Sequence, residues 1–597
     1  MLKKYNDFTW WLNLTQSSTI GDGDFVIMKN MLYNQANQVQ SRRGYAKLGD
    51  SVWSTPFSSY FFHKRDDTGA IICLWVAGTI MYKFDGTNRS SIKTGLIAVD
   101  WDGNPTRWDF AVYKNVVYMC DGFNKYASWD GTTYTELWFS NNVVATFDNT
   151  TDIIWKSWGW VHGLSDNMEI EFNTSWTMPA GIVAWQTYYV INSQADTTEF
   201  QISATYAGTA VNFTTDGSGT INYKFSSTPR CRYISYMHET IYAAWDTNNP
   251  ITVYNSDTQA VNWNIITNTV TVIWWDEQGK INWIFEMADV ALIMKDYKFV
   301  WYRLWSPTEV LDIQSWGYSD RSLSIVEDSL VFLSERWVDT LKFRSWITWV
   351  SALESKPLGE KVRELTKLIE PKFYNSNVAY YNRATNNYYF SFDSNWDDRP
   401  DKTLVYSSST QGWSEYLLPP IYDMWQYITD EWVVKHVFTS ALWWQMYELE
   451  SGLDDDGAVI ESEIETKPFD FGDPAQSYSI WFVDVIWYKQ EWLELVIQVI
   501  WDWDVVQEAT VTDSNIDITS SGAKPLWVSS LGIDTLWWSN QWDDLQVYPF
   551  TIRVPMFTYL STIAVNITWS GTQWIFEKMK IDVNGQPVEL FNYNNIL

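Results

Sequence analysis

The chain has 597 residues, with 41 Lys and Arg against 72 Asp and Glu, and a formal net charge of −31. This length predicts two to four domains, or one large propeller with additions. The acidic balance disfavours binding to nucleic-acid phosphates or anionic membranes, but it permits DNA to slide past an acidic wall. No apolar run reaches the ~18 residues of a membrane span, and no apolar stretch follows the two lysines of the first seven residues. We therefore expect a protein made in the cytoplasm without membrane insertion.

The pattern along the chain predicts an all-β protein built mainly as a β-propeller. Runs of about four to eight residues rich in Val, Ile, Tyr, Phe and Thr alternate with turn residues. The segment Phe84–Thr87 follows an apolar hairpin, and the similar Trp129–Thr132 follows another about 45 residues later, the span of one four-stranded blade. Similar apolar hairpins predict about six or seven blades in all; they cover residues 236–244, 288–300, 324–341, 379–392 and 438–449.

Changes in residue composition and in the pattern of apolar residues divide the chain into four expected regions. Residues 1–146 hold an N-terminal segment and the first blades, and residues 147–224, rich in Thr, Ala and Gly, form a small inserted β-domain. The remaining blades occupy 225–450. They are interrupted by one short helix at 359–369, where Val362, Leu365 and Ile369 share a face. Alternating apolar residues at 493–499 predict a C-terminal β-sandwich over 451–597.

Tryptophan is unusually frequent and glycine unusually rare. The chain has 41 Trp and only 28 Gly, and glycine is well below the roughly 7% usual in proteins. Many of the tryptophans lie at polar hairpin tips, where turns favour residues that tolerate positive φ. These tips hold Trp337, Trp396, Trp432 and Trp492. Doublets recur at Trp10-Trp11, Trp274-Trp275, Trp443-Trp444 and Trp537-Trp538, and Trp501 and Trp503 alternate with acids. With glycine in place of Trp, these segments would be ordinary loops.

Our hypothesis is that the gene uses UGA for glycine, so that a majority of the written tryptophans stand for glycine. The alternative is a carbohydrate-binding array with real Trp platforms, which predicts Trp on strands, alternating with polar residues. Some tryptophans fit aromatic positions of β-proteins and are expected to be genuine, among them Trp129 and Trp413. The codons at Trp10, Trp11, Trp337 and Trp396 distinguish the two interpretations.

The N-terminal motifs resemble a known family. Asp7–Asn13, Asp22-Gly23-Asp24, Met28–Met31 and Gln40–Tyr45 are similar to the start of phage tail nozzle (tubular) and tail accessory proteins built on a β-propeller. The family has Gly-Gly where this chain has Trp10-Trp11, as the recoding hypothesis predicts. Segments 174–181 and 188–191 resemble a small module of phage tail proteins, again with Trp176 and Trp185 at expected glycines. The resemblance covers most of the chain and is strongest at 7–45 and 160–220.

This resemblance implies a structural role without catalysis. Several copies would form a ring in the virion tail, a hexamer in the family, next to other tail and head–tail connector proteins. Double-stranded DNA would pass through the channel without specific binding. We expect no catalytic residue, no cofactor and no metal ligand.

The side chains that carry common chemistries are scattered. His63, His162, His238 and His436 lie in separate modules, and none has a Cys or His at metal-ligand spacing. Cys73, Cys120 and Cys231 are odd in number and far apart, which predicts buried free thiols. The chain has no Gly-rich phosphate loop and no Gly-x-Ser-x-Gly elbow.

Two acidic loops allow two interpretations. The loop Asp393–Asp397, with position 396 as glycine, alternates oxygen ligands as calcium loops do, but it lacks the closing Glu. Asp454–Gly457 is a second acid cluster. Either loop is a structural calcium site or a solvated hairpin tip.

Three functions remain open from the sequence. The first is a tail nozzle that guides DNA exit past repelling carboxylates. The second is a receptor-binding tail fibre or baseplate element, in which the inserted domain and the C-terminal domain contact the host. The third is a carbohydrate-binding propeller, either a lectin or a glycosidase.

Overall fold

The computed structural model describes residues 25–589 with interruptions. The longest gaps are 49–56, 157–163, 257–268, 272–279, 303–308, 311–318, 344–352, 469–477 and 520–547. The described chain is nearly all β, and its successive four-stranded sheets have a propeller-like arrangement. It divides into two compact units, Met1–Pro56 with Asp312–Leu597 and Phe57–Leu311. No helix among the described residues has the length and apolar character needed to cross a membrane.

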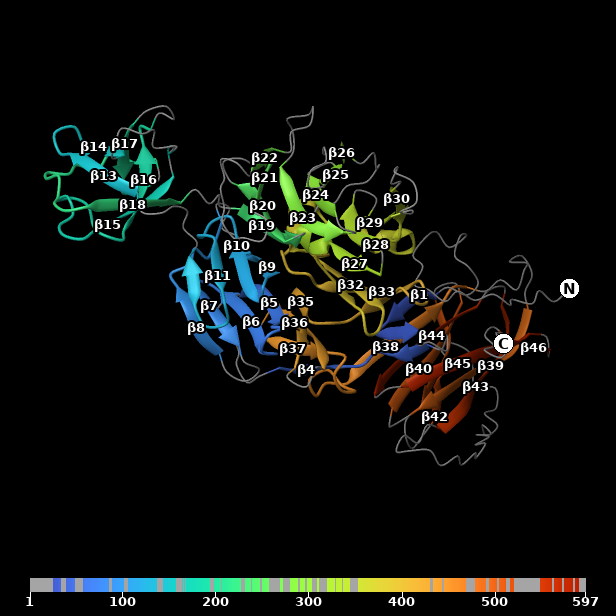
Figure 1. The fold of residues 1–597 in the computed structure, drawn as a ribbon. Helices are drawn as coiled ribbons and strands as arrows, with labels where there is room; N and C mark the ends of the chain where they lie inside the picture. The colour runs from blue at the N-terminus through green and yellow to red at the C-terminus, as the bar shows by residue number, and fades with distance from the viewer. Residues whose placement is uncertain are drawn as a thin grey trace. The chain divides into compact units, whose positions relative to one another are not determined.

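The unit Phe57–Leu311 contains four sheets of four antiparallel strands in up-and-down order (Figure 1). Their inner strands are short apolar runs such as Ile71–Ala77, whose Leu74 and Val76 are fully buried. The strands are β5 Phe57–Lys64, β6 Ile71–Ala77, β7 Ile80–Phe84, β8 Arg89–Thr94; β9 Asp109–Tyr113, β10 Val116–Cys120, β11 Ala127–Trp129, β12 Tyr134–Glu136; β19 Cys231–Met237, β20 Thr240–Asp246, β21 Thr252–Asn255, β22 Thr269–Thr271; β23 Ile281–Met287, β24 Val290–Lys295, β25 Lys298–Tyr302 and β26 Glu309–Val310.

A closed six-stranded barrel lies between β12 and β19 in the sequence (Figure 1, cyan to green). Alternating residues of its strands point inward and share one core, in which Phe147, Phe172 and Tyr223 make edge-to-face or tilted ring contacts. Its strands are β13 Val143–Asp148, β14 Ile153–Lys156, β15 Glu169–Thr174, β16 Thr187–Ile191, β17 Glu199–Ser203 and β18 Ile221–Ser226. This barrel occupies the region where the sequence places the inserted β-domain, 147–224.

The other unit contains two further four-stranded sheets. One is formed by β27 Ser324–Val326, β28 Ser329–Ser334, β29 Trp337–Phe343 and β30 Leu353–Pro357. The second combines distant parts of the chain, because β4 Tyr45–Lys47 pairs with β37 Met446–Leu449, next to β36 Val434–Ser440 and β35 Ile421–Ile428. An N-terminal strand therefore completes a sheet whose other three strands lie about 400 residues later in the sequence.

Two larger sheets complete this unit. A ten-stranded sheet begins with the up-and-down strands β31 Val378–Asn382, β32 Asn387–Phe392, β33 Lys402–Ser407 and β34 Gly412–Tyr416 and continues through β1 Phe25–Lys29, β38 Ile460–Thr466, β44 Ala564–Gly571, β40 Leu493–Trp501, β41 Asp504–Val511 and β42 Ile516–Thr519. The six-stranded sheet contains β2 Met31–Tyr33, β3 Val39–Ser41, β45 Trp574–Val583, β39 Tyr478–Lys489, β43 Tyr548–Leu560 and β46 Gln586–Glu589. Both sheets contribute to one hydrophobic cluster, which includes Phe25, Val39, Val483, Ile497 and Ile567.

The helical segment is shorter than the periodicity predicts. Only α1 Arg363–Thr366 is α-helical; it follows the 3₁₀ turn Glu360–Val362 and precedes a second 3₁₀ turn, Pro371–Ser376. Glu370 has extended dihedrals (φ −81°, ψ 141°), as steric contact with a following proline requires. The third 3₁₀ turn is Asp320–Ser322.

Candidate functional site

Arg42 is the centre of a dense network of polar contacts. It lies in the loop between β3 and β4, within the Gln40–Tyr45 segment that carries the family resemblance, and only 2% of it is exposed. Its two terminal nitrogens bind both carboxylate oxygens of Asp455, at 2.7 and 2.5 Å. This bidentate geometry is the strongest form of a charge-assisted hydrogen bond.

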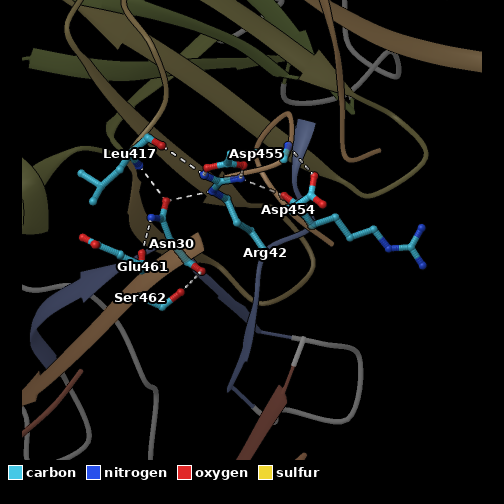
Figure 2. A network of polar contacts seen from close by, with 9 residues as sticks. Asn30, Arg42, Leu417, Asp454, Asp455, Glu461 and Ser462 are labelled. Atoms are coloured by element: carbon cyan, nitrogen blue, oxygen red, sulfur yellow. Dashed lines mark hydrogen bonds and ion pairs between the residues drawn. The ribbon is translucent and has the colours of Figure 1, made fainter. Parts of the chain in front are cut away.

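The remaining donors of the Arg42 guanidinium are also used. Nε donates to Oδ1 of Asn30 at 2.8 Å, and the terminal nitrogens donate to the carbonyls of Arg43 at 3.0 Å and Leu417 at 3.1 Å. The rings of Tyr45 and Tyr416 lie 6.0 and 5.6 Å from the guanidinium carbon. With five N–H donors and five acceptors, Arg42 has no donor left for a ligand. We call Arg42 and the residues that contact its guanidinium the Arg42 node; these are Asn30, Arg43, Tyr45, Tyr416, Leu417 and Asp455. Figure 2 shows the hydrogen bonds of this node.

Asn30 extends the node to the C-terminal strands. Its left-handed backbone (φ 56°) places its side chain between segments, where Nδ2 donates to the carbonyl of Glu461 and Oδ1 accepts from the backbone N–H of Leu417 at 2.7 Å. Its carbonyl accepts from the backbone N–H of Arg42 at 2.9 Å and from Ser462 Oγ at 3.4 Å. Figure 2 shows Asn30 bonded to Arg42, to Leu417 and to Glu461 and Ser462 of strand β38. The node therefore joins strands that the sequence separates by about 400 residues.

Gly44 permits close approach of the two chain segments at this node. A Cβ built on Gly44 would lie 1.6 Å from the carbonyl oxygen of Asp454. The backbone there is held by bonds from Ser451 N–H to the Gly44 carbonyl (2.9 Å) and from Asp456 N–H to the Tyr45 carbonyl (2.8 Å). Burial, and then the charge of Asp455, raises the pKa of Tyr45 to about 12, so its hydroxyl stays neutral at physiological pH.

Two further largely buried titratable side chains, Glu450 and His436, lie in the same unit as the node. Burial raises the pKa of Glu450, although the hydroxyl of Tyr389 donates to Oε1 and Asn382 Nδ2 donates to Oε2 at 3.2 Å. His436, 7% exposed, has its Nδ1 2.6 Å from the Tyr380 hydroxyl, and burial lowers its pKa to about 4. The contacts of both groups hold strands of one unit together.

The described histidines and cysteines do not form one site, although Cys120 and Cys231 share a hydrophobic cluster. His63 lies 3.4 Å from Asn115 Oδ1, His436 is buried beside Tyr380, and His162 and His238 lie outside the described residues. The prediction for Cys73, Cys120 and Cys231 is confirmed, because all three are buried and none of them forms a disulfide. Burial raises the pKa of Cys73 to about 12 and that of Cys120 well above its usual range, which makes both thiols poor nucleophiles.

The two acidic loops are tied to the protein. Asp393 is fully buried, and its carboxylate accepts backbone N–H bonds from Asn395 (3.0 Å), Trp396 (2.7 Å) and Asp398 (2.7 Å). The tip of this loop, residues 395–399, is exposed, as the solvated-tip interpretation predicts, whereas backbone amides bind the buried carboxylate of Asp393. In the second loop, the Asp455 carboxylate accepts hydrogen bonds from Arg42, and Asp454 Oδ1 accepts one from the backbone N–H of Gly457 at 3.0 Å. Among the described residues, no group of acidic, His and Cys side chains has a metal-binding arrangement.

Three described tryptophans have a left-handed backbone: Trp185 (φ 64°), Trp245 (φ 61°) and Trp396 (φ 69°). Trp176, Trp185 and Trp396 are 77%, 63% and 56% exposed. By contrast, Trp129 and Trp413 are buried, and Trp413 Nε1 donates to the Leu358 carbonyl at 3.1 Å. Trp337 opens strand β29, opposite Ser334, and Trp501 ends β40. The other tryptophans that the sequence singles out lie outside the described residues: Trp10, Trp11, Trp274, Trp275, Trp432, Trp443, Trp444, Trp492, Trp503, Trp537 and Trp538.

Sequence reasoning does not find the Arg42 node. Arg42 is noted only as part of a motif, Asp455 only as part of an acid cluster, and Asn30 only beside Met28 and Met31. The one available signal is Gly44 directly after two arginines, since a glycine there permits close backbone approach. Nothing in the spacing indicates that Asp455 is the partner.

Comparisons with known proteins do not assign a family. No family model matches the chain, and no curated protein matches it. Among solved structures, dihydro-heme d1 dehydrogenase NirN in complex with DHE matches 76% of this chain and 73% of that chain at 8% identity, with a TM-score of 0.26. Kluyveromyces lactis Hsv2 matches 61% of this chain and 98% of that chain at 10% identity, with a TM-score of 0.25. Similarity at this level assigns neither an activity nor a ligand.

Proposed function

We propose that this protein is a structural component of a phage virion tail, part of a ring or nozzle that joins the head-proximal tail to the tip and guides DNA exit. The observation that supports it most is the place of the motif Gln40–Tyr45, which carries the family resemblance. Its Arg42 and Gly44 tie the N-terminal strands to the last blade-like sheet and to the C-terminal strands. A wall element under mechanical load benefits from such closure.

The finer architecture that we propose is a seven-bladed propeller with a C-terminal sandwich. In this proposal the six four-stranded sheets are six blades, and the up-and-down strands β31–β34 of the ten-stranded sheet are the seventh. Strand β4 would close the ring by completing the last blade, a common device in propellers. The ten- and six-stranded sheets, which share the cluster containing Phe25 and Val483, would form the sandwich.

The proposal includes the reassignment of UGA to glycine. Left-handed backbone at Trp185, Trp245 and Trp396 supports it, because a Cβ makes that region costly and glycine does not. Burial of Trp413 with its Nε1 hydrogen-bonded supports a genuine indole there. The codons test the reassignment directly. UGG at Trp185 and Trp396 would contradict it.

In this proposal, electrostatic repulsion keeps DNA from binding to the channel wall. With a formal net charge of −31, subunits lining a channel would repel the DNA phosphates, so that DNA slides without specific binding. The neighbouring tail and head–tail connector proteins would bind the outer surfaces of the ring. No catalytic step, cofactor or metal is required.

Electron microscopy of the purified full-length protein tests the nozzle. We expect closed rings with a central channel, and hexamers if the stoichiometry follows the family resemblance. Monomers or isolated trimers at high protein concentration would contradict a nozzle, and trimers would favour a receptor-binding fibre.

A receptor-binding or carbohydrate-binding element is the second candidate. It is favoured by the exposure of Trp176 and Trp185 on the barrel, since exposed indoles provide stacking platforms for sugars. Glycan-array binding that Trp176→Ala and Trp185→Ala abolish would support this candidate over the nozzle. A tail nozzle would show no glycan binding, or glycan binding that these two substitutions do not change.

A further inference from the structure

The barrel β13–β18 and the blades next to it in the sequence have separate hydrophobic cores. Every member of the barrel cluster lies between Val143 and Tyr223, and the adjacent clusters contain only blade residues. In the described part of the chain, no barrel strand pairs with a blade strand. Among the described residues, neither apolar packing nor sheet pairing, which usually hold domains rigidly, joins the barrel to these blades.

Polar contacts centred on Lys125 join the two parts instead. Lys125, between β10 and β11, has its Nζ 3.1 Å from Glu171 Oε1 in β15 and 3.2 Å from Thr187 Oγ1 in β16. The Thr187 hydroxyl donates to the same Glu171 oxygen at 3.1 Å. One lysine thus contacts two strands of the barrel at once.

The contacts continue from Lys125 into the blades. Glu136, at the end of β12, has Oε2 3.6 Å from Lys125 Nζ and Oε1 2.5 Å from Lys93 Nζ in β8. The ammonium of Lys93 also lies 5.5 Å from the centroid of the Tyr134 ring. Charges of alternating sign therefore run from one blade through the next to the barrel: Lys93, Glu136, Lys125 and Glu171.

We propose that this row of charges is an ionic latch that docks the barrel against the blades and releases it when the pairing is weakened. The four charged side chains are 15–33% exposed, so water and salt screen them, and pairs of this kind hold weakly. A covalently tethered domain held by a few weak pairs exchanges between docked and undocked positions. The latch concerns this geometry alone and does not depend on the proposed tail function.

Fluorescence energy transfer in the full-length protein tests the latch. The native cysteines are buried, so dyes can be placed selectively at Ala70→Cys on the first blade-like sheet and Ala204→Cys on the barrel, both exposed positions. At about 0.05 M NaCl we expect one high-transfer population, and at about 1 M NaCl a second, low-transfer population. Glu171→Gln should lower the ratio of docked to undocked molecules by ~2- to 5-fold at low salt.

Two further variants keep the test decisive. Glu199→Gln removes a carboxylate of the same barrel outside the latch and should leave the distribution unchanged. Lys125→Glu should undock the barrel, and the charge swap Lys125→Glu with Glu171→Lys should restore docking, which a folding defect would not allow. The latch is wrong if the distributions of the parent and of Glu171→Gln coincide at both salt concentrations, or if Glu199→Gln undocks the barrel equally.

Discussion

The hydroxyl of Tyr380 lies 2.6 Å from Nδ1 of His436, and this pair joins strand β31 to strand β36. Nε2 of the same imidazole is buried without a hydrogen-bond partner in the described structure. Protonation would therefore leave a buried N–H donor without an acceptor, either at Nε2 or in competition with the Tyr380 hydroxyl, and burial disfavours the added charge. The pair is suited to a neutral imidazole only.

We predict that His436 makes the protein less stable in mild acid. Its pKa is about 4 when folded, against an ordinary value of 6.5, so the unfolded chain binds a proton that the folded chain does not. Stability is fully present above pH 6.5 and is lost as the pH falls from 6.5 towards 4, by up to about 3 kcal/mol at ~1.4 kcal/mol per pKa unit. Urea melts at pH 7.5, 6 and 5 measure this loss.

The His436→Gln variant isolates the effect. Glu450, whose pKa burial raises, works in the opposite direction, because its folded form gains stability as pH falls. The difference between the parent and His436→Gln cancels that contribution. An identical pH dependence in both proteins would contradict the prediction, and His63→Gln serves as the control for losing a histidine elsewhere.

Breaking the Arg42–Asp455 pair should be among the most destabilising changes in the chain. Asp455→Asn leaves the 2%-exposed guanidinium without its carboxylate, which costs about 3–5 kcal/mol for a buried pair. Arg42→Lys keeps the charge but loses the fork and the bonds to Asn30 and Leu417. The thermal midpoint measures both variants.

An exposed pair gives the matched control. Glu364 in α1 and Lys367, directly after it, are 53% and 42% exposed, so Glu364→Gln should change stability by less than about 0.5 kcal/mol. If Asp455→Asn costs no more than Glu364→Gln, the Arg42 node does not hold the unit together.

Gly44→Ala tests the close approach at the node. The added Cβ would meet the Asp454 carbonyl at 1.6 Å, so the backbone on one side must move and the bonds at Ser451 and Asp456 weaken. We expect a loss of about 3 kcal/mol or more, in the range of severe overpacking. Gly452→Ala has open space around it but φ +81°, so it should cost only about 1 kcal/mol. Equal losses in the two variants would show that close approach at Gly44 is unimportant.

The sequence predicts local strand structure far better than strand partners. Runs such as Ile71–Ala77 and Val116–Cys120 are strands because β-branched and aromatic residues fit a pleated, half-buried surface. The pairing of Phe25 with Thr466 and of Tyr45 with Leu449 has no local signal. Assigning the C-terminal domain to 451–597 alone therefore misses the contribution of β1, β2 and β3.

The same limit applies to the polar site. Asp393 and Asp455 are both acids in turn-like loops, and composition gives them the same two interpretations. The carboxylate of Asp393 accepts hydrogen bonds from backbone amides, and the carboxylate of Asp455 accepts them from Arg42. Which of these occurs depends on the segment that packs opposite, and that segment is distant in sequence. By contrast, the expectation of a packed aromatic at Trp413 needs only its own hairpin and agrees with its burial.

Replacing exposed, left-handed tryptophans by glycine should leave stability unchanged or raise it. At Trp185 and Trp396, with φ 64° and 69°, glycine removes a strain of about 1–2 kcal/mol, against roughly 0.5–1 kcal/mol of added chain entropy. The expected net gain is between zero and about 1.5 kcal/mol for each, measured by thermal melts. Solubility should also improve, because less indole surface faces water.

The buried tryptophans provide the contrast. Trp413→Gly removes an indole that packs against Tyr388 and Tyr406 and leaves the Leu358 carbonyl without its donor, so it should cost at least about 4 kcal/mol. The reassignment of UGA to glycine predicts that the stability changes of Trp396→Gly and Trp413→Gly have opposite signs. If Trp396→Gly instead destabilised the protein by more than about 1 kcal/mol, the indole would be a fitted part of the loop, and the carbohydrate-platform interpretation would gain support over the nozzle.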